Sequence, residues 1–494
     1  MSHAIRLAVV LAALVASPPV RADATADAAA SLQAQIRAWV AGLAGPTVDL
    51  GGHGVQVTPA GDAFRFALPV AGALGGTGWL LTGDPVTAVA KPLDGGSWAI
   101  QSLRLPTPLR ADRAATPGAS AGSWVLTLAD QTISGVFDPS LAAGSGFTAV
   151  LRGYDSRARS GDGTQTIHLD RFSWHGGWEP TGEGRATVAG EGQGEHLSIV
   201  TDSQDGSGRA IVAADRIRGG GRVERVAFDR LAAAVRGLTG LMPAAGDARG
   251  PDAIAADDRA RLRNLVLILR DLLGGAQEET TLEHVRLDIG GQRGSLASLT
   301  IGGRAAAADG MLDVSLRLSM EGIDSPLFPQ GPLRDYLPRR IALTPHLSGI
   351  PADALLSLLL RGLDGGEPEM LQAEALGLIA KAPVKAGLED LVLDFGPAVL
   401  KASGTVTVAA PDDIAGAARI VATGLDALIR RAVTVPELQA ATPFLLLLKG
   451  VGEQAGDVTT WNVTYAQGRA EVNGTDLSAL LGPPVPERPR GHRP

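Results

Sequence analysis

The chain has 494 residues, enough for two or three domains, and carries 52 acidic against 44 basic residues, a formal net charge of −8 at pH 7. This balance argues against nucleic acid as a partner, because phosphate binding needs a concentrated positive surface. The lack of cysteine excludes disulfides and thiolate chemistry, while 64 glycines, 31 prolines and 4% aromatic residues favour many turns and an aliphatic core.

The first 22 residues have the three parts of a signal peptide. Arg6 gives a positive start, residues 7–16 are apolar, and the segment ends in small residues at Ala22. An uncleaved membrane anchor is the alternative, but the apolar run is only about half of the ~20 residues that a membrane span requires. We therefore predict a cleavable signal peptide over 1–22, export to the periplasm, and no transmembrane segment after cleavage.

A first domain is predicted over 23–245. It begins with a helix in which Leu32, Ile36 and Leu43 recur at helical spacing, and we expect this apolar stripe to pack on the sheet that follows. An interfacial membrane helix is the alternative for this segment. From about residue 48 to 226, apolar and polar residues alternate between turn sequences without an intervening helix, which predicts antiparallel sheet.

A second domain is predicted over 246–482, after a linker near 244–252. Residues 282–290 read LEHVRLDIG and residues 388–396 read LEDLVLDFG, and both alternate as strands do. Helical periodicity occurs nearby, at 351–363, 369–382 and 436–450 among other segments. We infer repeated helix–strand units with copies near 251–326 and 367–430, a short third cycle at 436–481, and a disordered Pro/Arg tail at 483–494.

Three aspartates precede helix-like stretches in this pattern: Asp229, Asp426 and Asp476. Such a residue can accept hydrogen bonds from the free amides of the first helical turn, which stabilises a helix by about 1 kcal/mol. A set of catalytic carboxylates is the alternative. Their equivalent positions in repeated units favour helix caps.

These features together predict an α+β, β-rich fold, with extended curved antiparallel sheets built from repeated helix–strand units and amphipathic helices packed on the sheets. The signal sequence, the runs of amphipathic strands and closing hairpins such as NVTYAQGRAEVNGTDL resemble the AsmA-like and related periplasmic envelope proteins of Gram-negative bacteria. The resemblance implies curved sheets with an apolar inner face and a role in envelope lipid homeostasis.

The densest polar cluster is IHLDRFSWHGGWEP, which contains His168, Asp170, His175 and Glu179. On a strand, His168 and Asp170 share a face, where they could hold a metal or relay a proton. Metal sites need three or four converging ligands, and the pair supplies only two, so we interpret the segment as a solvated strand face.

Other short motifs lack the structural context that their chemistry requires. Residues 118–122 match a serine-hydrolase elbow but lie between a loop and a strand. Residues 202–208 lack the alternating oxygen ligands of a calcium loop, and the glycine-rich residues 190–194 sit between two strands with no helix behind them. We predict no catalytic, cofactor-binding or metal site, and hence a protein that is not an enzyme.

The main functional hypothesis is binding or transfer of an apolar envelope ligand such as a lipid. One-sided strands with few aromatic residues offer an aliphatic surface suited to acyl chains. The alternative is a structural or assembly factor of the cell envelope that binds protein partners through its sheet edges.

Overall fold

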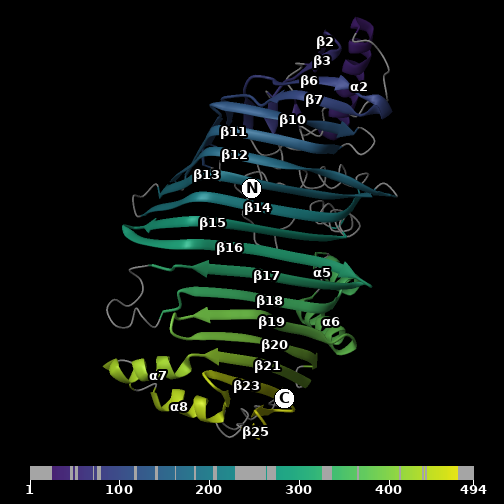
Figure 1. Cartoon of the computed structure of the whole chain (residues 1–494). Helices are drawn as coiled ribbons and strands as arrows, with labels where there is room; N and C mark the ends of the chain where they lie inside the picture. Colours follow the sequence, from purple (N-terminus) through teal and green to yellow (C-terminus); the bar gives the residue numbers. More distant parts are fainter. Residues whose placement is uncertain are drawn as a thin grey trace. The chain divides into compact units, whose positions relative to one another are not determined.

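Figure 1 shows the computed structural model of the chain, which forms two compact units, residues 1–295 and 296–494. The structure describes residues 25–44, 48–49, 54–70, 72–74, 79–115, 120–138, 143–161, 163–182, 185–203, 208–227, 263, 274–324, 337–363, 367–410, 413–436, 439 and 442–476. The expected signal peptide, linker and tail lie outside these ranges, as do most of the helical segments predicted between 228 and 273.

The first unit opens with helix α2 (Ala26–Ala44) and short antiparallel strands. The predicted antiparallel sheet is confirmed at its first hairpin, where β2 and β3 pair on either side of a turn at Gly61 and Asp62. The strands are β1 (Val48–Asp49), β2 (Gln56–Ala60), β3 (Ala63–Leu68), β4 (Gly72–Leu74), β5 (Trp79–Thr82), β6 (Val86–Pro92), β7 (Trp98–Arg104), β8 (Leu109–Arg113), β9 (Gly122–Thr127) and β10 (Asp130–Asp138).

This region contains a dense apolar core. Leu32 and Ile36 of α2 are buried in it, which confirms that the apolar stripe of this helix packs on the sheet. Trp98 lies at the centre, with Phe64 and Phe66 meeting its ring edge-on at centroid distances of 5.9 and 6.2 Å. Such edge contacts between aromatic rings add to the stabilisation from burial.

Five long strands follow, each paired antiparallel with the next in chain order. They run side by side in Figure 1, and their bounds are β11 (Ala143–Ser160), β12 (Gly163–Gly182), β13 (Arg185–Ser203), β14 (Arg209–Ala227) and β15 (Gly275–Ile289). The segment LEHVRLDIG lies at the end of β15 and its following turn. The glycine-rich residues 190–194, predicted to separate two strands, instead lie inside β13, where the rings of Trp174 and Phe172 lie close to Gly190 and Gly192.

A kink crosses these five strands at one level. Gly153, His196 and His284 have φ values of 55°, 54° and 53°, and the strand registers place Asp170 and Asp215 at the same level on the strands between them. The alternation of side chains reverses at the kink. Leu169 and Phe172 show this reversal. They are three residues apart on β12, so regular alternation would place them on opposite faces, yet both lie on the face toward which a side chain at Gly194 would point.

We call the two sides of β11–β15 the inner and outer faces. The inner face carries Leu169, Phe172, Ala214 and Val285, of which Ala214 and Val285 are almost fully buried. The outer face carries mainly charged and polar side chains, which include His168, Glu191 and Arg218.

The second unit begins within β16 (Gln292–Ala308) and continues as antiparallel strands, with four α-helices among its described residues. The strands are β17 (Met311–Glu321), β18 (Arg340–Pro351), β19 (Val384–Asp394), β20 (Val399–Ala410), β21 (Asp413–Thr423), β22 (Glu453–Ala455), β23 (Val458–Ala466), β24 (Arg469–Val472) and β25 (Thr475–Asp476). The helices are α5 (Ala352–Leu363), α6 (Pro368–Lys381), α7 (Leu425–Thr434) and α8 (Thr442–Val451).

The predicted α+β fold class is wrong. In the described part of the chain, 68% of residues lie in strands and 17% in helices, so the fold is mostly β. Each of the five described helices contacts strands locally, but these helices are short and do not form a repeated layer on the sheets. The strands are longer than the spacing of the predicted turns indicated, because glycine-rich segments that were interpreted as turns lie inside strands.

The predicted helix cap at Asp426 is wrong. The N-cap residue of α7 is Gly424, and Asp426, inside the first turn, makes no cap but pairs with Lys449 of α8. Asp476 ends β25, and the stretch that it was predicted to cap lies outside the described residues, as does Asp229, so these two caps stay predictions. Among the described residues, none of the helices combines the length and apolar character needed to cross a membrane.

Candidate functional site

The second unit has one continuous apolar sheet face. Its clearest part is a row of directly paired residues across seven strands, and all of them are apolar: Ile301, Leu318, Leu343, Leu391, Ala402, Ile420 and Trp461. A second such row contains Ala305, Val314, Leu347, Ala386, Val406, Gly416 and Tyr465. We call this surface the apolar face.

The opposite face of the same strands is polar. A corresponding row across the seven strands contains Arg304, Ser315, His346, Gly387, Thr405, Ala417 and Thr464. Alternation along the strands produces this separation, since successive side chains point to opposite sides. In β19 an irregularity between Leu388 and Leu391 keeps Ala386 and Leu391, five residues apart, on the same face.

Several large side chains of the apolar face remain exposed. Leu316 is 60% exposed, Ile301 55% and Leu347 44%, whereas large aliphatic residues in a globular protein are usually buried. At one end of the face, α7 and α8 pack on Ala422 and Trp461. A contiguous exposed apolar patch of this kind is a candidate binding surface.

A second candidate is the histidine cluster on the outer face of the first unit. His168 lies between two carboxylates, with Nδ1 2.7 Å from Asp155 Oδ1 and Nε2 2.7 Å from Asp170 Oδ1. Both nitrogens can donate only when the ring is an imidazolium. The hydrogen bond to Asp155, followed by that to Asp170, raises the pKa of His168. The bond from His168 likewise lowers the pKa of Asp170.

The pairing continues along the kink. His196 Nδ1 lies 2.8 Å from Asp170 Oδ2, and on the next pair of strands Asp215 meets Arg286 at 2.8 Å and His284 at 3.5 Å. An imidazolium held by two carboxylates has no lone pair for a metal, and the described residues contain no group of three or more His, Cys, Asp or Glu side chains arranged to hold one. These side-chain contacts join neighbouring strands at the level of the kink.

Only part of this cluster was predicted from the sequence. His168 and Asp170 share a face as expected, and their side chains are 41% and 52% exposed, but His175 lies apart from them and pairs with Glu191 at 2.8 Å. Asp155 and His196 were missed, because they come from neighbouring strands. Only the strand register, which short-range spacing does not define, could have identified them.

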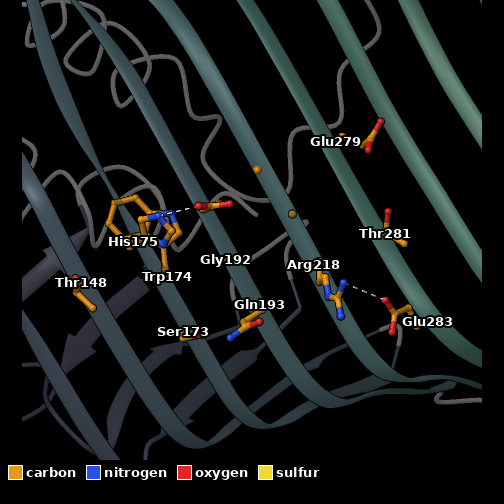
Figure 2. A pocket seen from close by; sticks show the side chains of 13 residues that line it. Thr148, Ser173, Trp174, His175, Gly192, Gln193, Arg218, Glu279, Thr281 and Glu283 are labelled. Carbon is orange, nitrogen blue, oxygen red and sulfur yellow. Dashed lines mark ion pairs between the residues drawn. The ribbon is translucent and has the colours of Figure 1, made fainter.

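The third candidate is a hollow of about 720 Å³ on the outer face. It lies on the side of the kink that contains Ser173 of β12 and Gly220 of β14. Figure 2 shows side chains from neighbouring strands around it, with His175 paired to Glu191 and Arg218 to Glu283. Gly192, Gly219 and Gly220 also line it, so part of its surface is bare backbone.

Comparison of the chain with models of known families found no match, and comparisons with curated proteins and with solved structures likewise found none. The geometry of the chain itself is therefore the basis for assigning a function.

Proposed function

We propose that this protein is an exported envelope protein that binds the aliphatic chains of a lipid on the apolar face of its second unit. The observation that carries the proposal is the pair of wholly apolar rows across seven strands, with Leu316 and Ile301 more than half exposed. Covering these side chains with an acyl chain stabilises the complex by roughly 0.8 kcal/mol per buried methylene.

The side-chain composition of the face favours a lipid over a protein partner. The cores of protein interfaces are enriched in aromatic residues, methionine and arginine. In the two rows the aromatic residues are Trp461 and Tyr465, both on β23, and the other positions are aliphatic or glycine. Trp461 is already covered by α8. A smooth aliphatic surface binds chains without selecting a particular shape.

The test is organic extraction of the purified protein, followed by mass spectrometry of the released lipids. We expect about one lipid or more per chain in the wild type and strong loss in Leu316→Glu, because burying an unpaired carboxylate against an acyl chain is costly. Ser315→Glu is the matched control, since Ser315 is the adjacent residue on the polar face, opposite Arg304.

A wild-type protein that is free of lipid after gentle purification contradicts the proposal. Equal lipid loss in both variants contradicts it as well, because the effect would then not depend on the face. A lipid-free protein that co-purifies with a stoichiometric envelope protein would instead support an assembly factor.

A further inference from the structure

The hollow on the outer face exists because one side chain is missing from a cross-strand row. His175, Glu191, Gly220 and Glu279 occupy directly paired positions on β12, β13, β14 and β15. Gly220 therefore leaves a gap between two glutamates whose strands are about 10 Å apart, twice the strand spacing. The gap lies over peptide backbone.

The next two rows border this gap with polar groups of both signs. One row contains Ser173, Gln193, Arg218 and Thr281, and the following row contains Arg171, Glu195, Arg216 and Glu283. The arginines of β14 pair with Glu283, at 3.0 Å from Arg216 and 3.7 Å from Arg218. The border thus holds its charges in pairs and presents donors beside acceptors.

We propose that this hollow is a binding site for a neutral, polyhydroxylated ligand of the oligosaccharide class. Each hydroxyl group of such a ligand both donates and accepts hydrogen bonds, which matches a border where Glu191 and Glu279 accept while Arg218 and Gln193 donate. The glutamates would repel a simple anion, and the arginine would repel a simple cation. The volume of about 720 Å³ is within the usual range for small-ligand sites, roughly 300–1,000 Å³.

Recognition at this site depends on hydrogen bonds and not on aromatic stacking. Trp174 contributes to the lining, but its ring lies over Gly176 and Gly190, on the inner face. The ligand would therefore rest on the backbone at Gly220 and bond to the side chains around it. This site is on the first unit and does not depend on the lipid proposal.

Filling the gap tests the proposal directly. A Cβ at Gly220 would have its nearest neighbour, the Gly190 carbonyl oxygen, at 3.4 Å, and the residue has no positive φ, so Gly220→Leu can fold. Ala213→Leu is the matched control, because Ala213 lies on the same strand and the same face, beyond the kink. Circular dichroism and thermal unfolding establish that both variants are folded.

Binding is measured by isothermal titration calorimetry with hexasaccharides of glucose, mannose and N-acetylglucosamine, and with inorganic phosphate and putrescine as ionic probes. We expect at least one hexasaccharide to bind the wild type and Ala213→Leu equally and Gly220→Leu at least about tenfold more weakly, a difference of about 1.4 kcal/mol. The proposal is overturned if no hexasaccharide binds, if Gly220→Leu binds as well as the wild type, or if only phosphate or putrescine binds.

Discussion

Asp170 and His196 face each other across β12 and β13, with 2.8 Å between Oδ2 and Nδ1, at the level where the strands kink. His196 has a φ of 54°, a left-handed conformation that is uncommon for residues other than glycine, although histidine adopts it more readily than most. This contact between the two side chains helps to hold a backbone conformation that the chain alone disfavours. Charge on the outer face and the shape of the sheet are linked at this point.

The first prediction concerns pH. The pKa of His168 is raised above 6.5 in the folded state, so its contribution to stability is fully present below pH 6.5 and is lost as pH rises through the folded pKa. We expect the unfolding free energy of the wild type to fall, relative to His168→Gln, as pH increases above about 6.5. Urea unfolding of both proteins over this pH range measures the difference.

Thr166→Val is the control for this experiment, because it changes a residue two positions away on the same strand without removing a titrating group. It should keep the wild-type pH dependence. At acidic pH we expect a separate loss of stability below about 3.8. The pKa of Asp170 is lowered in the folded state, so protonation of this carboxylate removes its contribution to the unfolding free energy. A pH profile that is unchanged in His168→Gln would contradict the assignment of an imidazolium between two carboxylates.

A second prediction concerns the start of α7. Gly424 has a φ of 72°, and a Cβ there would lie 2.1 Å from the carbonyl oxygen of Pro397. Gly424→Ala should lower the unfolding free energy by at least about 1–2 kcal/mol, from the left-handed conformation alone. Gly450→Ala in α8 should stabilise by up to about 1 kcal/mol, since nothing lies within 4 Å of the added carbon. Thermal unfolding distinguishes the two signs.

The sequence was most informative where a pattern is local. Periodicity over 351–363 and 369–382 predicted α5 and α6, and the alternation in LEHVRLDIG and LEDLVLDFG predicted strand. The wrong fold class came from extending such local patterns to a repeated unit. Glycine at 190–194 was interpreted as a break, yet within β13 it provides room for the rings of Phe172 and Trp174. Local propensity does not contain that cross-strand packing.

The apolar face, the histidine cluster and the hollow were predictable only in part, because cross-strand neighbours are not contained in local patterns. A one-sided apolar surface follows from alternation within each strand, and the seven-strand rows agree with it. The partners of His168 and the gap at Gly220 depend on register, which sets the neighbours on adjacent strands. A single sequence does not specify that register.

A third prediction concerns the core of the first unit. Trp98 is 1% exposed and meets both Phe64 and Phe66. Trp98→Ala should destabilise this unit by about 3–5 kcal/mol, through lost burial and the cavity left behind. Leu80→Ala on β5 is the control, since Leu80 is 51% exposed and should change stability by no more than about 0.5 kcal/mol. Urea unfolding measures both, and a small effect at Trp98 would contradict the assigned core.

The last prediction concerns the end of α8, where strand and turn side chains bond to its final carbonyl groups. Trp461 donates its indole N–H to the carbonyl of Leu448 at 2.8 Å, and Asn473 donates to that of Val451 at 3.0 Å. These carbonyls have no partner within the helix, so the bonds fasten α8 to the sheet. Trp461→Phe should keep most of the apolar contact but lose the bond, which costs about 1–3 kcal/mol where the carbonyl stays unpaired. Hydrogen exchange should then speed up in α8 more than in α5, and Tyr465→Phe on the same strand should leave both rates unchanged. Equal acceleration in α5 and α8 would mean that the substitution loosens the whole unit and that the bond does not specifically anchor α8.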